Sequence, residues 1–107
     1  MSDHPLRSRA DVVTDAPARY AKQLVAHLGH KLAFTIDGPT ATAAIGAATA
    51  QIAVGDGVLT LLATSRDEPS LARVEDVLGR HLERFGERQD LTVTWARTNR
   101  ALSEEPA

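Results

Sequence analysis

The hydrophobic positions of this chain change period several times, from the spacing of helices to the alternation of strands. Apolar residues that recur about every 3.6 positions predict two helices, each with one face toward a core. The first spans residues 15–28, and its inward stripe comprises Tyr20, Leu24, His27 and Leu28. The second precedes Gly86, and its inward stripe comprises Leu71, Val74, Leu78, His81, Leu82 and Phe85.

The residues that flank both stripes are typical of helix ends. Thr14 is expected to cap the first helix, and Ser65 with Glu68 forms a capping box for the second. Each helix also has an acidic residue and a proline near its start, where unpaired backbone N–H groups favour them. We expect Gly29 to end the first helix in a left-handed conformation and Gly86 to end the second.

Alternating apolar and polar residues predict strands in the rest of the chain, at residues 10–13, 32–37, 40–45, 49–54, 58–64 and 91–95. The middle four are joined by short turns rich in small residues, including Asp37-Gly38-Pro39 and Gly55-Asp56-Gly57. Strands joined in this way are expected to form an antiparallel meander.

The predicted order is therefore β-α-β-β-β-β-α-β. Because each helix has a single apolar face, we expect an α+β two-layer sandwich with both helices on one face of a mainly antiparallel sheet. Residues 1–8 are expected to be a flexible arm, residues 9–97 a single domain and residues 98–107 a flexible tail. The open sheet face, which could pair two copies as a homodimer, is expected to carry Thr42, Thr60, Thr92 and Thr94, with Val58 and Leu62.

Composition narrows the classes of function. The 12 basic and 14 acidic side chains give a net charge of −2. Nucleic-acid-binding domains usually have an excess of basic residues, and this chain has none. Cysteine is absent, which excludes disulfides, thiolate metal sites and cysteine nucleophiles. No apolar run approaches the roughly 20 residues that span a bilayer, and no apolar leader is visible. We therefore expect a cytoplasmic protein that binds neither nucleic acid nor membrane.

Three histidines could carry chemistry. His27 and His81 lie on the inward stripes of helices that should share one sheet face, so their side chains could meet. His30 follows His27 by three positions but lies beyond Gly29. Neutral imidazole is a ligand for transition metals, so these three residues are the candidate metal ligands. The alternative is that each imidazole is partly buried and hydrogen-bonded within the fold.

Further polar residues near the histidines extend this candidate site. Arg19, Tyr20 and Gln23 lie one or two turns before His27 and could form a ligand-binding edge. Tyr20 and a nearby histidine could instead form a general acid pair. The alternative for Tyr20 is a buried ring whose hydroxyl is hydrogen-bonded. Lys31 would be the Schiff-base residue of a lyase. No established catalytic motif is present, so catalytic residues stay unassigned.

These residues also form a recognisable pattern. A-R-Y-x-x-Q-L-x-x-H-x-x-H-K from Ala18 to Lys31, then H-L-E-R-F from His81 to Phe85, resembles the bacterial domain of unknown function 2218 family. The likeness covers residues 9–96. The resemblance implies a small bacterial protein with no established activity. Some members of that family are encoded beside, or joined to, siderophore-interacting flavoproteins and iron-uptake genes. Some members have been labelled as lyases. Residues 44–48 lack the Phe-Pro-Phe-Gly-like stretch common in that family, which implies a smaller or altered pocket.

Three hypotheses of function follow. The first is a non-catalytic accessory or binding module connected with iron or siderophore handling, which holds a transition metal ion or small ligand through the residues named above. The second is an interaction domain that forms a homodimer or docks a partner such as a siderophore-interacting flavoprotein. The third is a small lyase-type or acid–base enzyme that uses Tyr20, His27 or Lys31.

Overall fold

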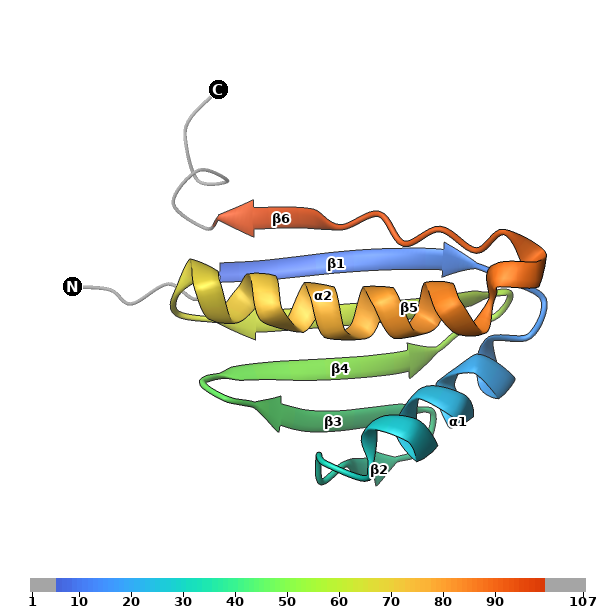
Figure 1. Cartoon of the computed structure of the whole chain (residues 1–107), viewed down its shortest axis with the longest axis horizontal. Helices are drawn as coiled ribbons and strands as arrows, with labels where there is room; N and C mark the ends of the chain where they lie inside the picture. Colours follow the sequence, from blue (N-terminus) through green and yellow to red (C-terminus); the bar gives the residue numbers. More distant parts are fainter. Residues whose placement is uncertain (1–5, 100–107) are drawn as a thin grey trace.

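The computed structural model of the protein describes residues 6–99, which form six strands, two α-helices and one short 3₁₀ helix. Their order along the chain confirms the predicted β-α-β-β-β-β-α-β arrangement (Figure 1). The elements are β1 (Leu6–Val13), α1 (Pro17–Leu28), β2 (Thr35–Asp37), β3 (Thr40–Ile45), β4 (Ala48–Val54), β5 (Val58–Ser65), α2 (Glu68–Phe85), η1 (Glu87–Gln89) and β6 (Ala96–Asn99).

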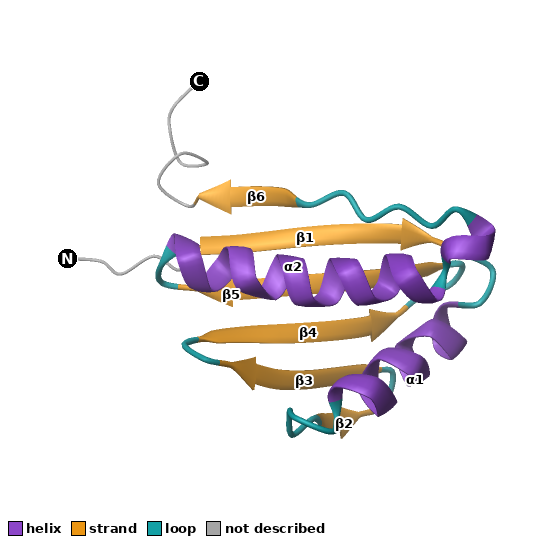
Figure 2. Ribbon diagram, viewed as in Figure 1, coloured by secondary structure: helices purple, strands orange, loops and turns teal. Residues whose placement is uncertain are grey.

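The strands form one antiparallel sheet in the order β2-β3-β4-β5-β1-β6. Consecutive pairing from β2 to β5 confirms the predicted meander, and β1 lies between β5 and β6. Both helices cover the same face of the sheet, with α2 over β5 and its neighbours and α1 nearer the β2 edge (Figure 2). The fold is therefore the expected two-layer α+β sandwich.

The core lies between the helices and the sheet, and it is almost entirely aliphatic. Alternate residues of each central strand point toward the helices, as in β5, where Leu59 and Leu61 are fully buried. Leu24 of α1 and Leu78 and Leu82 of α2 face them and are also fully buried. The inner residues of β3 and β4 are mostly alanine, so the core is shallower beneath α1.

The first strand begins at Leu6, four residues earlier than predicted, so residues 6–8 belong to the sheet and not to a flexible arm. Polar residues concealed this part of the strand. Arg7 and Arg9 point to the open face, while Ser8 points inward, where its hydroxyl donates a hydrogen bond to Glu75 of α2 over 2.6 Å. The rest of the predicted arm, residues 1–5, lies outside the described residues.

The predicted strand at residues 91–95 is wrong, because the last strand is β6 at Ala96–Asn99. Leu91, Val93 and Trp95 do alternate, but they pack against the core beside α2 and not within the sheet. The Val93 N–H donates to the carboxylate of Glu83 on α2 over 2.9 Å. Residues 98–99 of the predicted tail thus belong to β6, and residues 100–107 lie outside the described part.

The predicted strand at residues 32–37 is shortened to β2, because the chain after α1 continues in tight turns. Gly29 adopts right-handed helical angles, with φ −63°, so the predicted left-handed stop is wrong. The Lys31 and Leu32 N–H groups both donate to the Leu28 carbonyl. This compact ending holds His30 and Lys31 close to the end of the helix.

The helix starts also differ from the predicted caps. Thr14 accepts a hydrogen bond from the Ala16 N–H, but Ala16 is the N-cap of α1 and has no capping side chain. At α2 the cap is Asp67, whose carboxylate accepts from the Ser70 N–H over 2.8 Å, while Ser65 accepts from the Asp67 N–H. Asp67 therefore replaces the predicted capping box as the start signal.

The second sheet face carries no helix within residues 6–99 (Figure 2). Thr42, Thr60, Val58 and Leu62 lie on it half-buried, as expected, but Thr92 and Thr94 lie in the segment before β6 and not on the sheet. Val13 on the same face is 80% exposed. Pairing of two copies through this face stays a prediction. No helix in the described range is long and apolar enough to cross a membrane.

Candidate functional site

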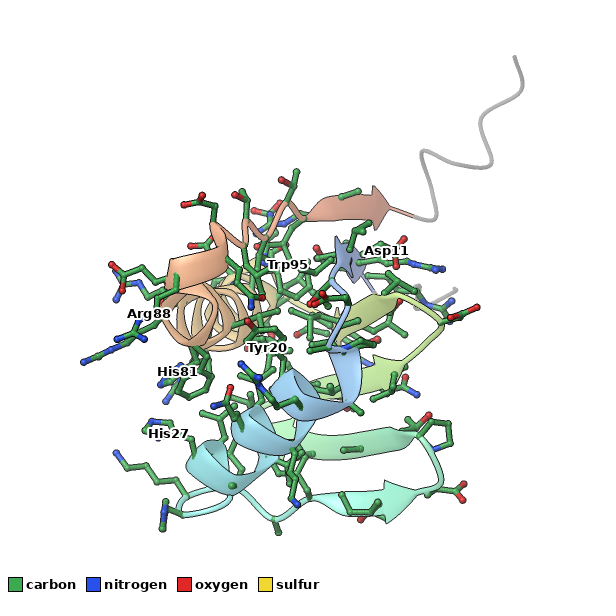
Figure 3. The ribbon with its side chains drawn as sticks, turned by 90° about the vertical axis from the view of Figure 1, so that its right-hand side faces the viewer. Asp11, Tyr20, His27, His81, Arg88 and Trp95 are labelled. Atoms are coloured by element: carbon green, nitrogen blue, oxygen red, sulfur yellow. The ribbon has the colours of Figure 1, made fainter. Side chains whose placement is uncertain are left out.

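His27 and His81 meet between the two helices, as their positions on the inward stripes suggested. Their ring centroids lie 4.9 Å apart, with the ring planes tilted by 45°. His27 comes from the last turn of α1 and His81 from the second half of α2. Figure 3 shows the two side chains pointing into the same space between the helices.

Phe85 packs against this pair from one turn further along α2. Its ring meets His27 edge-on at a centroid distance of 5.6 Å and lies 6.4 Å from His81. The spacing of four between His81 and Phe85 places both on one side of α2. Aromatic contact thus limits the directions that the two imidazoles can take.

The hydrogen bond of His81 fixes which ring nitrogen can serve a ligand. Its Nδ1 lies 2.6 Å from the backbone carbonyl oxygen of Val77. Because a carbonyl oxygen only accepts, Nδ1 carries a proton in this arrangement. In the neutral ring, Nε2 is then the free acceptor or metal-ligating atom, and protonation turns Nε2 into a second donor.

The histidine pair lies at the wall of a cavity of about 640 Å³, which we call the histidine cavity. Its basic lining residues come from the end of α1, the turn after it and α2: His27, His30, Lys31, Arg73 and His81. Its apolar lining residues are Leu28, Leu32, Ile45 and Val77. None of the described residues that line this cavity is acidic. The cavity is therefore basic at its rim in a chain whose net charge is −2.

Arg73 lines the histidine cavity but is not among the site residues predicted from the sequence. The signal was present in the spacing, since Arg73, Val77 and His81 follow one another by four positions. Residues four apart lie on one side of a helix, one turn above the other. A cationic residue on the same side as His81 could therefore have been counted with the histidines.

Arg19, Tyr20 and Gln23 do not line the histidine cavity. Tyr20 is 1% exposed, and its hydroxyl donates to the Gln89 side-chain oxygen over 2.7 Å. The Arg19 guanidinium lies 5.6 Å from the centroid of the Tyr20 ring, in a cation–π contact. Tyr20 is thus a buried ring whose bonded hydroxyl joins α1 to η1, which was the alternative to a ligand-binding role.

The three candidate metal ligands share a cavity but do not form a three-ligand centre. Within residues 6–99 no group of three or more His, Asp or Glu side chains is placed to hold a metal ion. His27 and His81 are in ring contact, and His30 contributes to the lining. Two imidazoles alone are fewer than the three or four protein ligands typical of zinc sites.

A second polar cluster joins α2 to two strands. The Glu75 carboxylate accepts from Ser8 of β1 and from the Arg97 guanidinium of β6, with distances of 2.8 and 2.9 Å to the two Arg97 nitrogens. The hydrogen bond from Arg97 chiefly lowers the pKa of Glu75, and that from Ser8 adds to the effect, while partial burial opposes it. Ser8 and Arg97 are both bonded to Glu75, which indicates a structural connection between α2 and the two strands.

Comparison with known proteins supports the fold and the family. Residues 9–96 match the model of a family described as an uncharacterized protein conserved in bacteria (DUF2218). The chain belongs to the DUF2218 family. It is also similar to the NMR structure of PA4090 from Pseudomonas aeruginosa, with a TM-score of 0.72 and 27% sequence identity over 85% of this chain and 95% of that chain. No curated protein matches the chain at a significant level.

Membership of the DUF2218 family confirms the resemblance seen in the sequence and agrees with its predicted extent. Every residue that lines the histidine cavity falls inside the matched range. The description of the DUF2218 family specifies no activity. Function therefore has to be argued from the cavity itself.

Proposed function

We propose that the protein is a non-catalytic binding module that holds a small anionic ligand in the histidine cavity. The observation that carries this proposal is the lining: five basic side chains around about 640 Å³, with no acidic residue among those described. The overall charge of −2 means that this is a local concentration of basic groups and not a general property of the surface. Such a concentration attracts anions.

The remaining lining defines the kind of anion. The apolar lining residues Leu28, Leu32, Ile45 and Val77 leave room for the carbon skeleton that joins the anionic groups of the ligand. Arg73 offers a planar fork of donors that suits a carboxylate or phosphate, and Lys31 adds a point charge. A small organic carboxylate or phosphate ester fits both features.

A role in iron or siderophore handling is the specific form of this proposal that the family resemblance suggests. Ferric complexes of polycarboxylates such as citrate are anions, so they belong to the ligand class that a basic cavity favours. In this form the protein holds the anionic iron complex, and a siderophore-interacting flavoprotein is the proposed partner. The basic rim supports the anionic character of such a ligand but does not identify it.

Direct metal binding is a second candidate, because the imidazoles of His27 and His81 are in contact. The Nδ1 hydrogen bond to Val77 orients His81 with Nε2 as the free ligand atom, a common feature of metal-binding histidines. A metal held in this way needs further ligands from outside the pair, because no carboxylate or third imidazole of the described residues is placed to complete the site.

The kind of ligand that binds separates the two candidates. We would measure calorimetrically the affinity for citrate, ferric citrate and Zn²⁺. Binding of the two anions without binding of Zn²⁺ supports the anion site, because basic side chains attract anions. Binding of Zn²⁺ alone supports direct metal binding by the imidazoles of His27 and His81.

Substitutions then locate the site. We expect Arg73→Gln to weaken anion binding by about tenfold, the effect of losing one charge-assisted contact of roughly 1.4 kcal/mol. Lys31→Gln weakens it in the same direction. Lys22→Gln is the matched control, because Lys22 is the chain's other lysine and lies outside the histidine cavity. Anion affinity that is equal in wild type and Arg73→Gln would contradict the proposal.

A further inference from the structure

A second concave site lies on the other side of α1, away from the histidine cavity. It has a volume of about 440 Å³ and is lined by residues of α1, β2, β3 and β4 and of the turn between β2 and β3. Figure 1 shows α1 near this edge of the sheet. We call this second site the aliphatic groove. Its principal apolar walls are Ala21 and Val25 of α1, Ile36 of β2, and Ile52 and Val54 of β4.

The groove exists because small side chains face each other across it. Ala18, Ala21 and Ala26 line it from α1, and Ala41 of β3 faces them. Protein interiors normally fill such space by setting large residues against small ones. Here the alanines on both walls each contribute only a methyl group, so the space between α1 and the sheet stays unfilled and open at its edge.

Ile36 supports a binding role for the groove. Its register opposite Ala41 places it on the helix-covered face of the sheet, yet its side chain is 59% exposed. Only Val13, on the opposite sheet face, is a comparably exposed large apolar residue among those described. An aliphatic side chain that borders an apolar groove and remains exposed is typical of a surface that a ligand covers.

Charge specifies the ligand further. Lys22 is the single charged side chain among the described residues that line the groove. It is exposed on α1, whose other residues that line the groove are alanine and valine, so it marks one part of an otherwise aliphatic wall. A ligand that matches this lining has one anionic group and a long saturated chain.

We propose that the aliphatic groove binds a medium-chain monocarboxylic acid, with its alkyl chain along the alanine, isoleucine and valine walls and its carboxylate beside Lys22. The volume of about 440 Å³ lies within the roughly 300–1,000 Å³ of small-molecule pockets. This inference does not depend on the histidine cavity, which differs in lining and lies on the other side of α1.

A chain-length series tests the proposal. The methyl resonances of Ile36 and Val54 are followed by NMR during titration with hexanoate, octanoate and decanoate. Because each buried methylene contributes about 0.8 kcal/mol in transfer from water, affinity is expected to rise about fourfold per methylene until the groove is filled. Absence of a shift in these resonances, or affinity independent of chain length, would overturn the proposal.

Two variants test the assigned walls. Lys22→Gln should weaken decanoate binding several-fold but leave the binding of decanol unchanged, since decanol has the same alkyl chain without the charge. Arg88→Gln removes one exposed charge outside both sites and should change neither. Ala26→Leu should weaken both ligands by filling the groove at an exposed helix position, with dispersed NMR spectra as the check on folding.

Other occupants give distinct results. If decanoate shifts Leu32 and Ile45 and leaves Ile36 unaffected, the acid binds in the histidine cavity and the groove proposal is wrong. If the Ile36 and Val54 resonances respond to protein concentration and not to the acid, the groove is a contact between two copies, which also overturns it.

Discussion

At the scale of single residues, Glu75 shows how a polar side chain can connect layers of the fold. It reaches from α2 to the buried hydroxyl of Ser8 and to the Arg97 guanidinium, so one carboxylate joins the helix to β1 and β6. The side chain is 15% exposed, and its charge is compensated by Arg97. Removing one member of such a group leaves the others partly buried without their partner.

We expect Glu75→Gln to lower the free energy of unfolding at neutral pH by about 1–2 kcal/mol, through the lost charge-assisted hydrogen bonds. The pKa of Glu75 is lowered in the folded protein, chiefly by Arg97. Its stabilising contribution is therefore present above the ordinary carboxyl pKa and is lost as pH falls through the folded pKa. Wild type and variant should converge in acid, as denaturant titrations across pH would measure.

Asp76→Asn is the matched control for this prediction. Asp76 follows Glu75 directly, but its ion pair with Arg80 is exposed, with side-chain exposures of 59% and 78%. Exposed pairs of this kind contribute about 0–1 kcal/mol. A loss in Asp76→Asn as large as that in Glu75→Gln would show that burial and the contact with Ser8 are unimportant.

At the scale of elements, the segment of residues 91–95 shows why alternation alone does not identify a strand. Leu91, Val93 and Trp95 alternate as strand residues do, but the segment lies beside α2 and not in the sheet. Gly79 of α2 and Gly86, which directly follows it, make this possible. A Cβ at Gly79 would lie 3.1 Å from Nε1 of Trp95, and one at Gly86 would lie 2.3 Å from Cδ1 of Leu91.

We therefore expect Gly86→Ala to destabilise the protein by about 1–3 kcal/mol, the usual effect of overpacking, because the new methyl group would overlap the Leu91 side chain. Combining it with Leu91→Ala should restore part of the loss, giving a non-additive double-mutant cycle in thermal or denaturant unfolding. Strictly additive effects would mean that the new methyl group does not act through the contact with Leu91.

The parts of the fold with local signals were the predictable ones. Residues 40–45 lie between short turns, and β3 matches that prediction at both ends. The start of β1 was missed because the burial of Ser8 depends on Glu75, which is 67 positions away. Periodicity placed His27 and His81 on facing stripes, but it could not show that Tyr20 bonds Gln89.

At the scale of the whole molecule, α1 separates two concave sites of different character. The histidine cavity lies on the side toward α2 and is basic, and the aliphatic groove lies toward the β2 edge and has one lysine. The chain's two lysines are divided between them. The proposed ligands of both sites are anions, held at separate places in a protein whose net charge is negative.

If the histidines serve a ligand, their removal should affect binding more than stability. We expect His81→Leu to change the free energy of unfolding by no more than about 1 kcal/mol, because the side chain is only partly buried and its Nδ1 has a single hydrogen bond, to the Val77 carbonyl. Citrate affinity should fall in the same variant, because residues that serve a ligand are often not the ones that stabilise the fold best. A loss of stability greater than about 1 kcal/mol with unchanged citrate affinity would assign His81 to the fold alone.

The most direct test of the proposed function is to locate a bound anion by NMR. The protein would be titrated with citrate while side-chain resonances are followed. We predict shifts in the imidazoles of His27 and His81 and in the methyl groups of Leu32 and Ile45, with no response from Leu62 on the open sheet face. Unchanged imidazole resonances at saturating citrate, or shifts confined to the open face, would contradict anion binding in the histidine cavity.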